Sequence, residues 1–256
     1  MKKKERILPL QAKEVIEIEE EPKIEEAIEK AVEEEIPVPK KRWEEREEAI
    51  WIPRTKLGKD VRAGKIKDID EIFDKSIPIL EAGITTTLIP DLQMELINIG
   101  QSKGKFGGGK KRIWRQTQKK TAEENVPTFA CMVVVGDGKG HVGLGYGKSS
   151  ETLPAKEKAI RNARINIMRI KRGCGSFDCV CKEGHSIPFK VEGKCGSARI
   201  ILTPAPRGTG LAIEDECKKV LKLAGIRDIY SKTFGQTRTK FNLIKACFKA
   251  LEKTTQ

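Results

Sequence analysis

The sequence lacks the features of a membrane or secreted protein. No apolar run approaches the roughly 18 to 20 residues that a membrane-spanning helix needs. The N-terminus, MKKKERILPLQAKEV, begins with basic residues but continues without the apolar segment of a secretory signal. We therefore expect a cytosolic protein with no membrane partner.

Aromatic residues and histidines are also scarce. Aromatic side chains make up only 5% of the chain, so base stacking is not expected to be its main way of binding nucleic acid; phosphate and shape contacts fit better. The only two histidines, His141 and His185, offer no plausible Ser/His/Asp triad. Seven cysteines, an odd number among 256 residues, argue against a disulfide framework and for thiols or a metal site.

Charge, in contrast, is abundant and unevenly distributed. Residues 1–50 hold 11 Lys or Arg against 16 Glu, a net charge of −5, whereas the remainder carries +18. A body this basic predicts a polyanionic partner. The length allows one large domain or two ordinary ones with buried cores.

Patterns of apolar residues and glycine predict an α+β fold. Residues 129–135 (FACMVVV) predict a fully buried strand, and the Asp-Gly turn at 136–140 leads into a returning strand at 141–147. Glycines leave one face of that returning strand bare, which lets a helix approach closely. A helix is expected from about 154 to 170, completing two layers, with an apolar stripe of Ala159, Ile160, Ala163, Ile167 and Ile170.

The pattern of apolar residues in the C-terminal part predicts a second, smaller α+β domain of two layers. A hairpin is expected near 187–206, and helices are expected at about 214–224, closed by Gly225, and at 240–252. The resulting division is an acidic disordered extension at 1–42, an N-terminal segment at 43–90, a sheet/helix domain at 91–172, a Cys/His linker at 173–186 and the C-terminal domain at 187–256.

Two short glycine patterns look like nucleotide-binding motifs. Residues 138–143 match G-x-G-x-x-G, but the third glycine falls in a strand-like segment and not at the opening of a helix. Residues 147–149 (GKS) look like the end of a P-loop, but Val142 stands where that motif requires glycine. We interpret both as by-products of the hairpin.

Residues 100–115 (GQSKGKFGGGKKRIWR) form the most basic and glycine-rich segment. Glycines let backbone N–H groups approach phosphates, and a polyanion would order such a loop by releasing counterions. A solvated loop is the alternative, but the charge of the whole body favours contact with RNA. The candidate contacts are Lys103, Lys105, Lys110, Lys111, Arg112 and Arg115.

Other basic residues extend this candidate RNA surface. In PAPRGTG (204–210), Arg207 could contact a phosphate near a helix N-terminus, although the segment also suits a rigid loop. Arg238 precedes the last helix, where a solvated charge is nearly as good an interpretation. The remaining candidates lie on the hairpin and on the outer side of the first long helix: Lys139, His141, Lys148, Lys156, Arg161 and Arg164.

The sharpest local chemistry is a Cys/His cluster in the order C-x4-C-x-C-x3-H, formed by Cys174, Cys179, Cys181 and His185. Three thiols and one imidazole suit tetrahedral zinc. The alternative is a loop of exposed, reduced thiols, because the spacing is not that of a standard zinc knuckle. No apolar pattern explains these cysteines, which favours metal.

A zinc ion here would be structural and would hold the linker between the two domains. Cys195 is an alternative ligand. The other three cysteines fall on apolar faces and are expected in the core: Cys131, Cys217 and Cys247.

Taken together, the hairpin sequence VVVGDGKGHVGLGYGKS (133–149), PAPRGTG and the cysteine loop resemble the small-ribosomal-subunit protein S five family in its archaeal form, whose eukaryotic counterpart is protein S two. The resemblance covers roughly residues 51–253. It implies a double-stranded-RNA-binding-like domain at 91–172, a C-terminal ribosomal domain at 187–256, and a similar Cys/His cluster in archaeal members.

The resemblance also implies a function in the small subunit. It implies rRNA binding through the basic loop, proximity to proteins S four and S three at the mRNA entry, and contact with S eight through the C-terminal domain. It further implies roles in assembly, decoding fidelity and mRNA unwinding, with no catalysis and no small-molecule substrate. The alternative hypothesis is a zinc- or nucleotide-dependent enzyme that processes nucleic acid, which would require an open metal position or a bound nucleotide.

Overall fold

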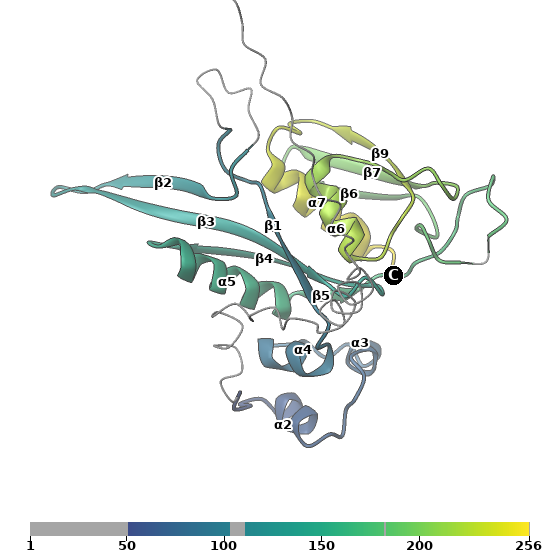
Figure 1. Cartoon of the computed structure of the whole chain (residues 1–256), viewed down its shortest axis with the longest axis horizontal. Coiled ribbons are helices and arrows are strands. Elements are labelled where there is room, and N and C mark those ends of the chain that lie inside the picture. Colours follow the sequence, from purple (N-terminus) through teal and green to yellow (C-terminus); the bar gives the residue numbers. More distant parts are fainter. Residues whose placement is uncertain (1–50, 103–110, 182, 256) are drawn as a thin grey trace, which may run out of the picture. The chain divides into compact units, whose positions relative to one another are not determined.

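The computed structural model describes residues 51–102, 111–181 and 183–255. The predicted acidic extension at 1–42 and the candidate contacts Lys103, Lys105 and Lys110 lie outside this part of the chain. Residues Ile52–Gln256 form one unit of mixed helices and strands with two sheets, which agrees with the predicted α+β class (Figure 1). Among the described residues, no helix is both long and apolar enough to span a membrane.

The first sheet is built around one long strand, β3. Strand β2 pairs with the first half of β3 and β1 with its second half, and β4 pairs along the opposite edge. Beyond the sheet body, β2 and β3 continue as a long ribbon (Figure 1). The five strands are antiparallel: β1 (Gln93–Ile97), β2 (Arg115–Lys120), β3 (Asn125–Gly136), β4 (His141–Ser149) and β5 (Ile167–Arg169).

Helix α5 (Thr152–Ile165) packs on this sheet through direct backbone contact with β4. The glycines at alternate positions of β4 face the alanines at every fourth position of α5. A Cβ atom at Gly145 would collide with the carbonyl oxygen of Ala159, and Gly143 and Gly147 meet the neighbouring turns in the same way. The bare strand face predicted from the sequence is therefore confirmed.

The second half of strand β3, from Ala130 to Gly136, is buried on both faces, as its apolar run predicts. Cys131, Val133 and Val135 belong to the cluster beneath α5, whereas Met132 and Val134 belong to the cluster that includes the C-terminal helices. An antiparallel sheet commonly leaves one face in water. Here the second face is covered by the rest of the chain.

The C-terminal part forms a four-stranded sheet with two helices on one face. The strand order is β6-β7-β9-β8, with β8 parallel to β9 and the other pairs antiparallel. Helix α7 contacts β6 where Gly193 again leaves room for a helix backbone, at Ala246. The elements are β6 (Val191–Cys195), β7 (Ala198–Pro204), β8 (Leu211–Ala212), α6 (Asp215–Leu223), β9 (Ile229–Phe234) and α7 (Lys240–Glu252).

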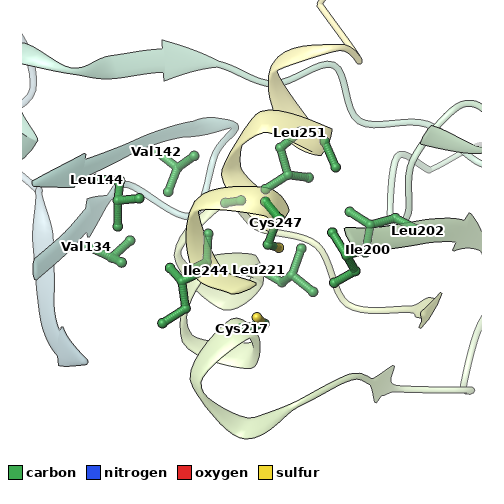
Figure 2. Packing of buried hydrophobic residues seen from close by; sticks show 14 of the residues in the cluster. Val134, Val142, Leu144, Ile200, Leu202, Cys217, Leu221, Ile244, Cys247 and Leu251 are labelled. Carbon is green, nitrogen blue, oxygen red and sulfur yellow. The ribbon is translucent and has the colours of Figure 1, made fainter. Parts of the chain in front are cut away.

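One apolar cluster joins the two sheets. Val134, Val142 and Leu144 of the first sheet share it with Ile244 and Leu251 of α7 (Figure 2). The residues of these two sheets therefore fold around a common core and hold the loops between them in place.

The first long helix ends earlier than the sequence pattern predicts. Asn166 leaves the helical conformation, with φ −92° and ψ 35°, and β5 then pairs with β4. Ile167 and Ile170 are buried, but from β5 and the residue after it. The helical spacing of the apolar residues continues by chance into β5, because β-branched isoleucines also pack well in a strand.

Among residues 51–92, three short helices precede the first sheet: α2 (Lys56–Arg62), α3 (Asp70–Asp74) and α4 (Ala82–Leu88). Thr55 caps α2, its hydroxyl oxygen accepting from the Gly58 N–H at 3.0 Å. Helix α3 is held by His141, whose ring nitrogens lie 2.6 Å from Asp137 Oδ2 and 3.2 Å from Asp70 Oδ1. The Phe73 ring stacks on His141.

We expect Gly145→Ala to destabilise the protein strongly, by about 3 kcal/mol or more, because the added methyl group must push α5 away from β4. Gly64→Ala is the matched control. It has no atom within 4 Å of the added group but a φ of +72°, so it should cost only about 1 to 2 kcal/mol of backbone strain. Urea unfolding measures both. An equal loss in the two variants would contradict the close-packing explanation.

The stability of the unit should also depend on His141. Burial lowers the pKa of His141, but Asp137 and Asp70 together outweigh it, so the pKa is raised. Protonation therefore stabilises the folded state: the contribution is complete below the unfolded pKa of about 6.5 and is lost as pH rises through the folded value. The His141→Gln variant, measured by urea unfolding, should not show this loss of stability as pH rises. A wild-type minus variant difference that stays constant from pH 5 to pH 9 would refute it.

Candidate metal centre and nucleic-acid interface

The four predicted metal ligands converge. One ligand atom from each of Cys174, Cys179, Cys181 and His185 lies within 4.8 Å of the others. His185 Nε2 is 3.0 Å from the Cys181 Sγ and 3.6 Å from the Cys179 Sγ. Three sulfurs and one imidazole nitrogen around one point could hold a metal ion.

Backbone contacts close the loop that carries these ligands. Gly173 and Ser186 form an antiparallel bridge, each N–H donating to the other's carbonyl oxygen at 2.9 Å. A side chain at Gly175 would collide with the carbonyl oxygen of Pro188, so this residue too permits a tight return of the chain. The loop therefore begins and ends at one place, and its ligands face one another.

A buried carboxylate stands behind His185. Asp228 Oδ2 lies 2.8 Å from His185 Nδ1, an ion-pair distance, although the ring N–H direction is not aligned for a hydrogen bond. Asp228 Oδ1 accepts hydrogen bonds from the N–H groups of Gly208 and Gly210, at 3.1 and 2.8 Å. A carboxylate at Nδ1 favours the tautomer that leaves Nε2 free for a metal.

The surroundings of Cys179 favour ionisation of its thiol. The backbone N–H of Arg207, followed by contacts with Cys181, lowers the pKa of Cys179 to about 6. The proximity of the Cys179 sulfur raises the pKa of Cys181 to about 12. The two thiols titrate as a pair, and the first proton leaves easily, as a metal-binding thiol requires.

The other cysteines lie elsewhere in the described part of the chain. Cys195, the alternative ligand, is at the end of β6, packed against the large core and outside the cluster. Cys131, Cys217 and Cys247 are fully buried, which confirms that they are core residues.

The structure describes three of the predicted cations at the C-terminal end of the basic segment 100–115: Lys111, Arg112 and Arg115. Arg112 and Arg115 are exposed. Lys111 is half-buried, and its Nζ donates to the Arg238 carbonyl oxygen at 2.5 Å, so two predicted RNA contacts that are 127 residues apart are neighbours. Burial is the main cause of the lowered pKa of Lys111.

The predicted contacts on the hairpin and on α5 divide into two groups. Lys139, Lys148 and Arg161 are exposed, whereas Lys156 and Arg164 are half-buried on α5. His141 is different, because both of its ring nitrogens already face carboxylates. These contacts hold α3, and the RNA contact of His141 stays a prediction.

Arg207 and Arg238 both lie in exposed loops. Arg207 stands beside the metal-ligand loop, 3.9 Å from the Glu183 carboxylate. Its position joins the PAPRGTG segment to the Cys/His cluster, a proximity that no local sequence pattern predicts.

The apparent nucleotide motifs are parts of the hairpin. Gly138 and Gly140 adopt positive φ angles of 69° and 123° in the turn, and Gly143 and Gly147 lie within β4 against α5. None of these glycines opens a helix, so the pattern does not form the phosphate cradle of either motif.

Sequence reasoning missed Asp228 and Asp70. Asp228 is 43 residues from its histidine, and Asp70 is 71 residues from His141. Neither stands in a pattern with its partner, so only the fold reveals the pairing.

Comparison with known proteins supports, along most of the chain, the family resemblance seen in the sequence. Residues 113–171 match the family model for the N-terminal domain of ribosomal protein S5, and residues 193–256 match that for its C-terminal domain. The small ribosomal subunit protein uS5 of Nanoarchaeum equitans is 48% identical over 203 residues, covering 79% of this chain and 87% of that protein.

Two further relatives show similar agreement. The small ribosomal subunit protein uS5 of Thermofilum pendens is 47% identical over 206 residues, 80% of this chain and 95% of that protein. The uS5 protein of Methanocaldococcus jannaschii is 45% identical over 202 residues, 79% and 86% of the two chains. On this similarity, together with the two matched domains, the chain belongs to the small ribosomal subunit protein uS5 family.

Proposed function

We propose that this protein is a structural, non-catalytic component of the small ribosomal subunit in the cytoplasm and that it binds rRNA. Its membership of the uS5 family carries this proposal, and the net charge of +18 on residues 51–256 supports it. Lysines and arginines neutralise phosphates while the packed sheets and helices hold one shape against the folded RNA. No bond is made or broken.

The proposed RNA surface includes the basic segment at 100–115 and the exposed cations of the hairpin, of α5 and of the PAPRGTG loop. Exposure of Arg112, Arg115, Lys139, Lys148 and Arg161 supports this assignment. We divide the chain for this function at the boundaries predicted above, with residues 91–172 as the main rRNA-binding domain.

The finer roles also remain proposals. We infer that the protein supports subunit assembly, translational accuracy and mRNA entry and unwinding. Its neighbours would be proteins S four, S eight and S three. The enzyme alternative has less support, because the apparent nucleotide motifs lie in a hairpin and against a helix backbone.

We further propose that Cys174, Cys179, Cys181 and His185 hold a structural zinc ion. The convergence of four ligand atoms, the lowered pKa of Cys179 and the carboxylate behind His185 fit this metal. Bound zinc would join the thiolates and the imidazole in one cross-link. With four protein ligands, no position is left for a catalytic water.

Reversal of the exposed charges after the basic loop should weaken RNA binding. Six to ten phosphate contacts would make wild-type affinity fall about 10³- to 10⁵-fold between 50 and 200 mM salt. The double variant Arg112→Glu, Arg115→Glu should lower the slope of log affinity against log salt by about two. Filter binding to small-subunit rRNA measures this slope. The control pair Lys194→Glu, Lys249→Glu makes the same charge change on other elements. Equal slopes in the two pairs would reject the loop assignment.

The zinc proposal is tested through Asp228. Asp228→Asn removes the charge behind His185 and should weaken zinc binding about 10- to 100-fold. Competition with a chromophoric chelator measures the dissociation constant. Glu183→Gln is the control, since it changes an exposed carboxylate in the same loop that contacts no ligand nitrogen. A wild-type protein without zinc affinity refutes the metal, whereas equal affinities in wild type and Asp228→Asn refute only the role of Asp228.

A further inference from the structure

We propose that Lys139, Arg172, Lys222 and Arg227 form a binding site for the phosphates of an RNA strand where the two sheets meet. The inference rests on the proposed rRNA binding and adds a site to it. Only Lys139 belongs to the surface predicted from sequence.

Two adjoining recesses define the site. The first, of about 520 Å³, lies among the hairpin turn, the residues after β5, the metal-ligand loop and the loop after α6. The second, of about 670 Å³, lies between Gly138 and the end of α6. Arg172, Gly225 and Arg227 line both, so the recesses form one continuous surface.

Arg172 occupies the middle of this surface beside three glycines, whose missing side chains leave room for it. Added side chains at Gly225 and Gly140 would come within 3.0 Å of its Nη1 and 3.7 Å of its Nε, and one at Gly184 within 3.2 Å of its Cβ. Its Nη1 also lies 3.5 Å from the carbonyl oxygen of Gly138. The residue is exposed, so the remaining guanidinium N–H groups are available to a ligand.

The charges in the recesses are strongly unbalanced. The lining includes six Lys or Arg side chains but only two carboxylates, those of Asp70 and Glu183. Asp70 is paired with Arg169 and with His141, and Glu183 lies 3.9 Å from Arg207.

Four cations are left over from this pairing. Of the remaining lining cations, Lys218 is paired with Asp215 outside the recesses. Within the part of the chain that the structure describes, no carboxylate pairs with the other four, all of them exposed: Lys139, Arg172, Lys222 and Arg227. Exposed cations held close together without counter-charges favour an anionic ligand.

An RNA strand fits this arrangement better than a free phosphate ion. Of these two recesses, Lys222 lines only the second and Lys139 only the first, with the contact between Gly138 and Gly225 beside them. Lys139 also borders a third recess, beside α3, that is lined by carboxylates. One phosphate group can occupy one recess, whereas a strand with successive phosphates can engage the cations of both. Release of several counterions then contributes to affinity.

The test is the binding of the full-length protein to small-subunit rRNA over a range of salt concentrations. Lys222→Glu, Arg227→Glu should weaken binding about tenfold or more at 150 mM salt and lower the salt slope by about two. The pair Lys194→Glu, Lys249→Glu serves as the control of equal charge, and thermal unfolding verifies that both variants fold. Arg172→Lys, which keeps the charge but removes the planar fork, should give a smaller loss.

The outcomes separate this inference from the proposed function. If wild-type protein does not bind rRNA, the proposed function fails. If wild type binds but the recess pair and the control pair behave alike, the recess site is refuted and rRNA binding stands. Saturable binding of inorganic phosphate that depends on Lys222 and Arg227, with unchanged RNA affinity, would likewise refute an RNA strand as the ligand.

Discussion

The backbone contact between β4 and α5 is the constraint on which the architecture depends. Glycine at every second strand position and alanine at every fourth helix position bring two backbones together with almost no side chain between them. Packing this close tolerates little change, because a single methyl group has no space to enter. It also anchors the first sheet firmly to one helix and leaves its other apolar face to be covered elsewhere.

That second face decides how the C-terminal part is attached. Met132, Val134 and Val142 require apolar partners. Helix α6 contacts β1, β3 and β4, and Ile244 and Leu251 of α7 belong to the same apolar cluster (Figure 2). Helix α7 also covers β6, again across a glycine. Because one core includes both sheets, loops from distant parts of the chain lie side by side. The hairpin turn, the residues after β5, the metal-ligand loop and the loop after α6 meet there.

Much of the candidate site follows from this meeting of loops. The Cys/His cluster is local and was predictable from spacing, since all four ligands lie within twelve residues, 174–185. The carboxylate behind His185 and the recess around Arg172 could not be predicted from the sequence, because their residues come from separate elements. His141 shows the opposite case. A basic hairpin suggested RNA contact for it, but Asp70 from α3 occupies its second ring nitrogen.

The sequence alone determined the α+β class, the buried strand, the glycine hairpin, the last helix and the four residues of the Cys/His cluster, because each depends on residues close together in the chain. It misplaced the end of α5, since an apolar spacing can continue from a helix into a strand. The tertiary structure alone decided that Asp228 supports His185 and that four exposed cations without a carboxylate partner among the described residues gather between the sheets. Such contacts depend on how two sheets share one core, and no local pattern records that.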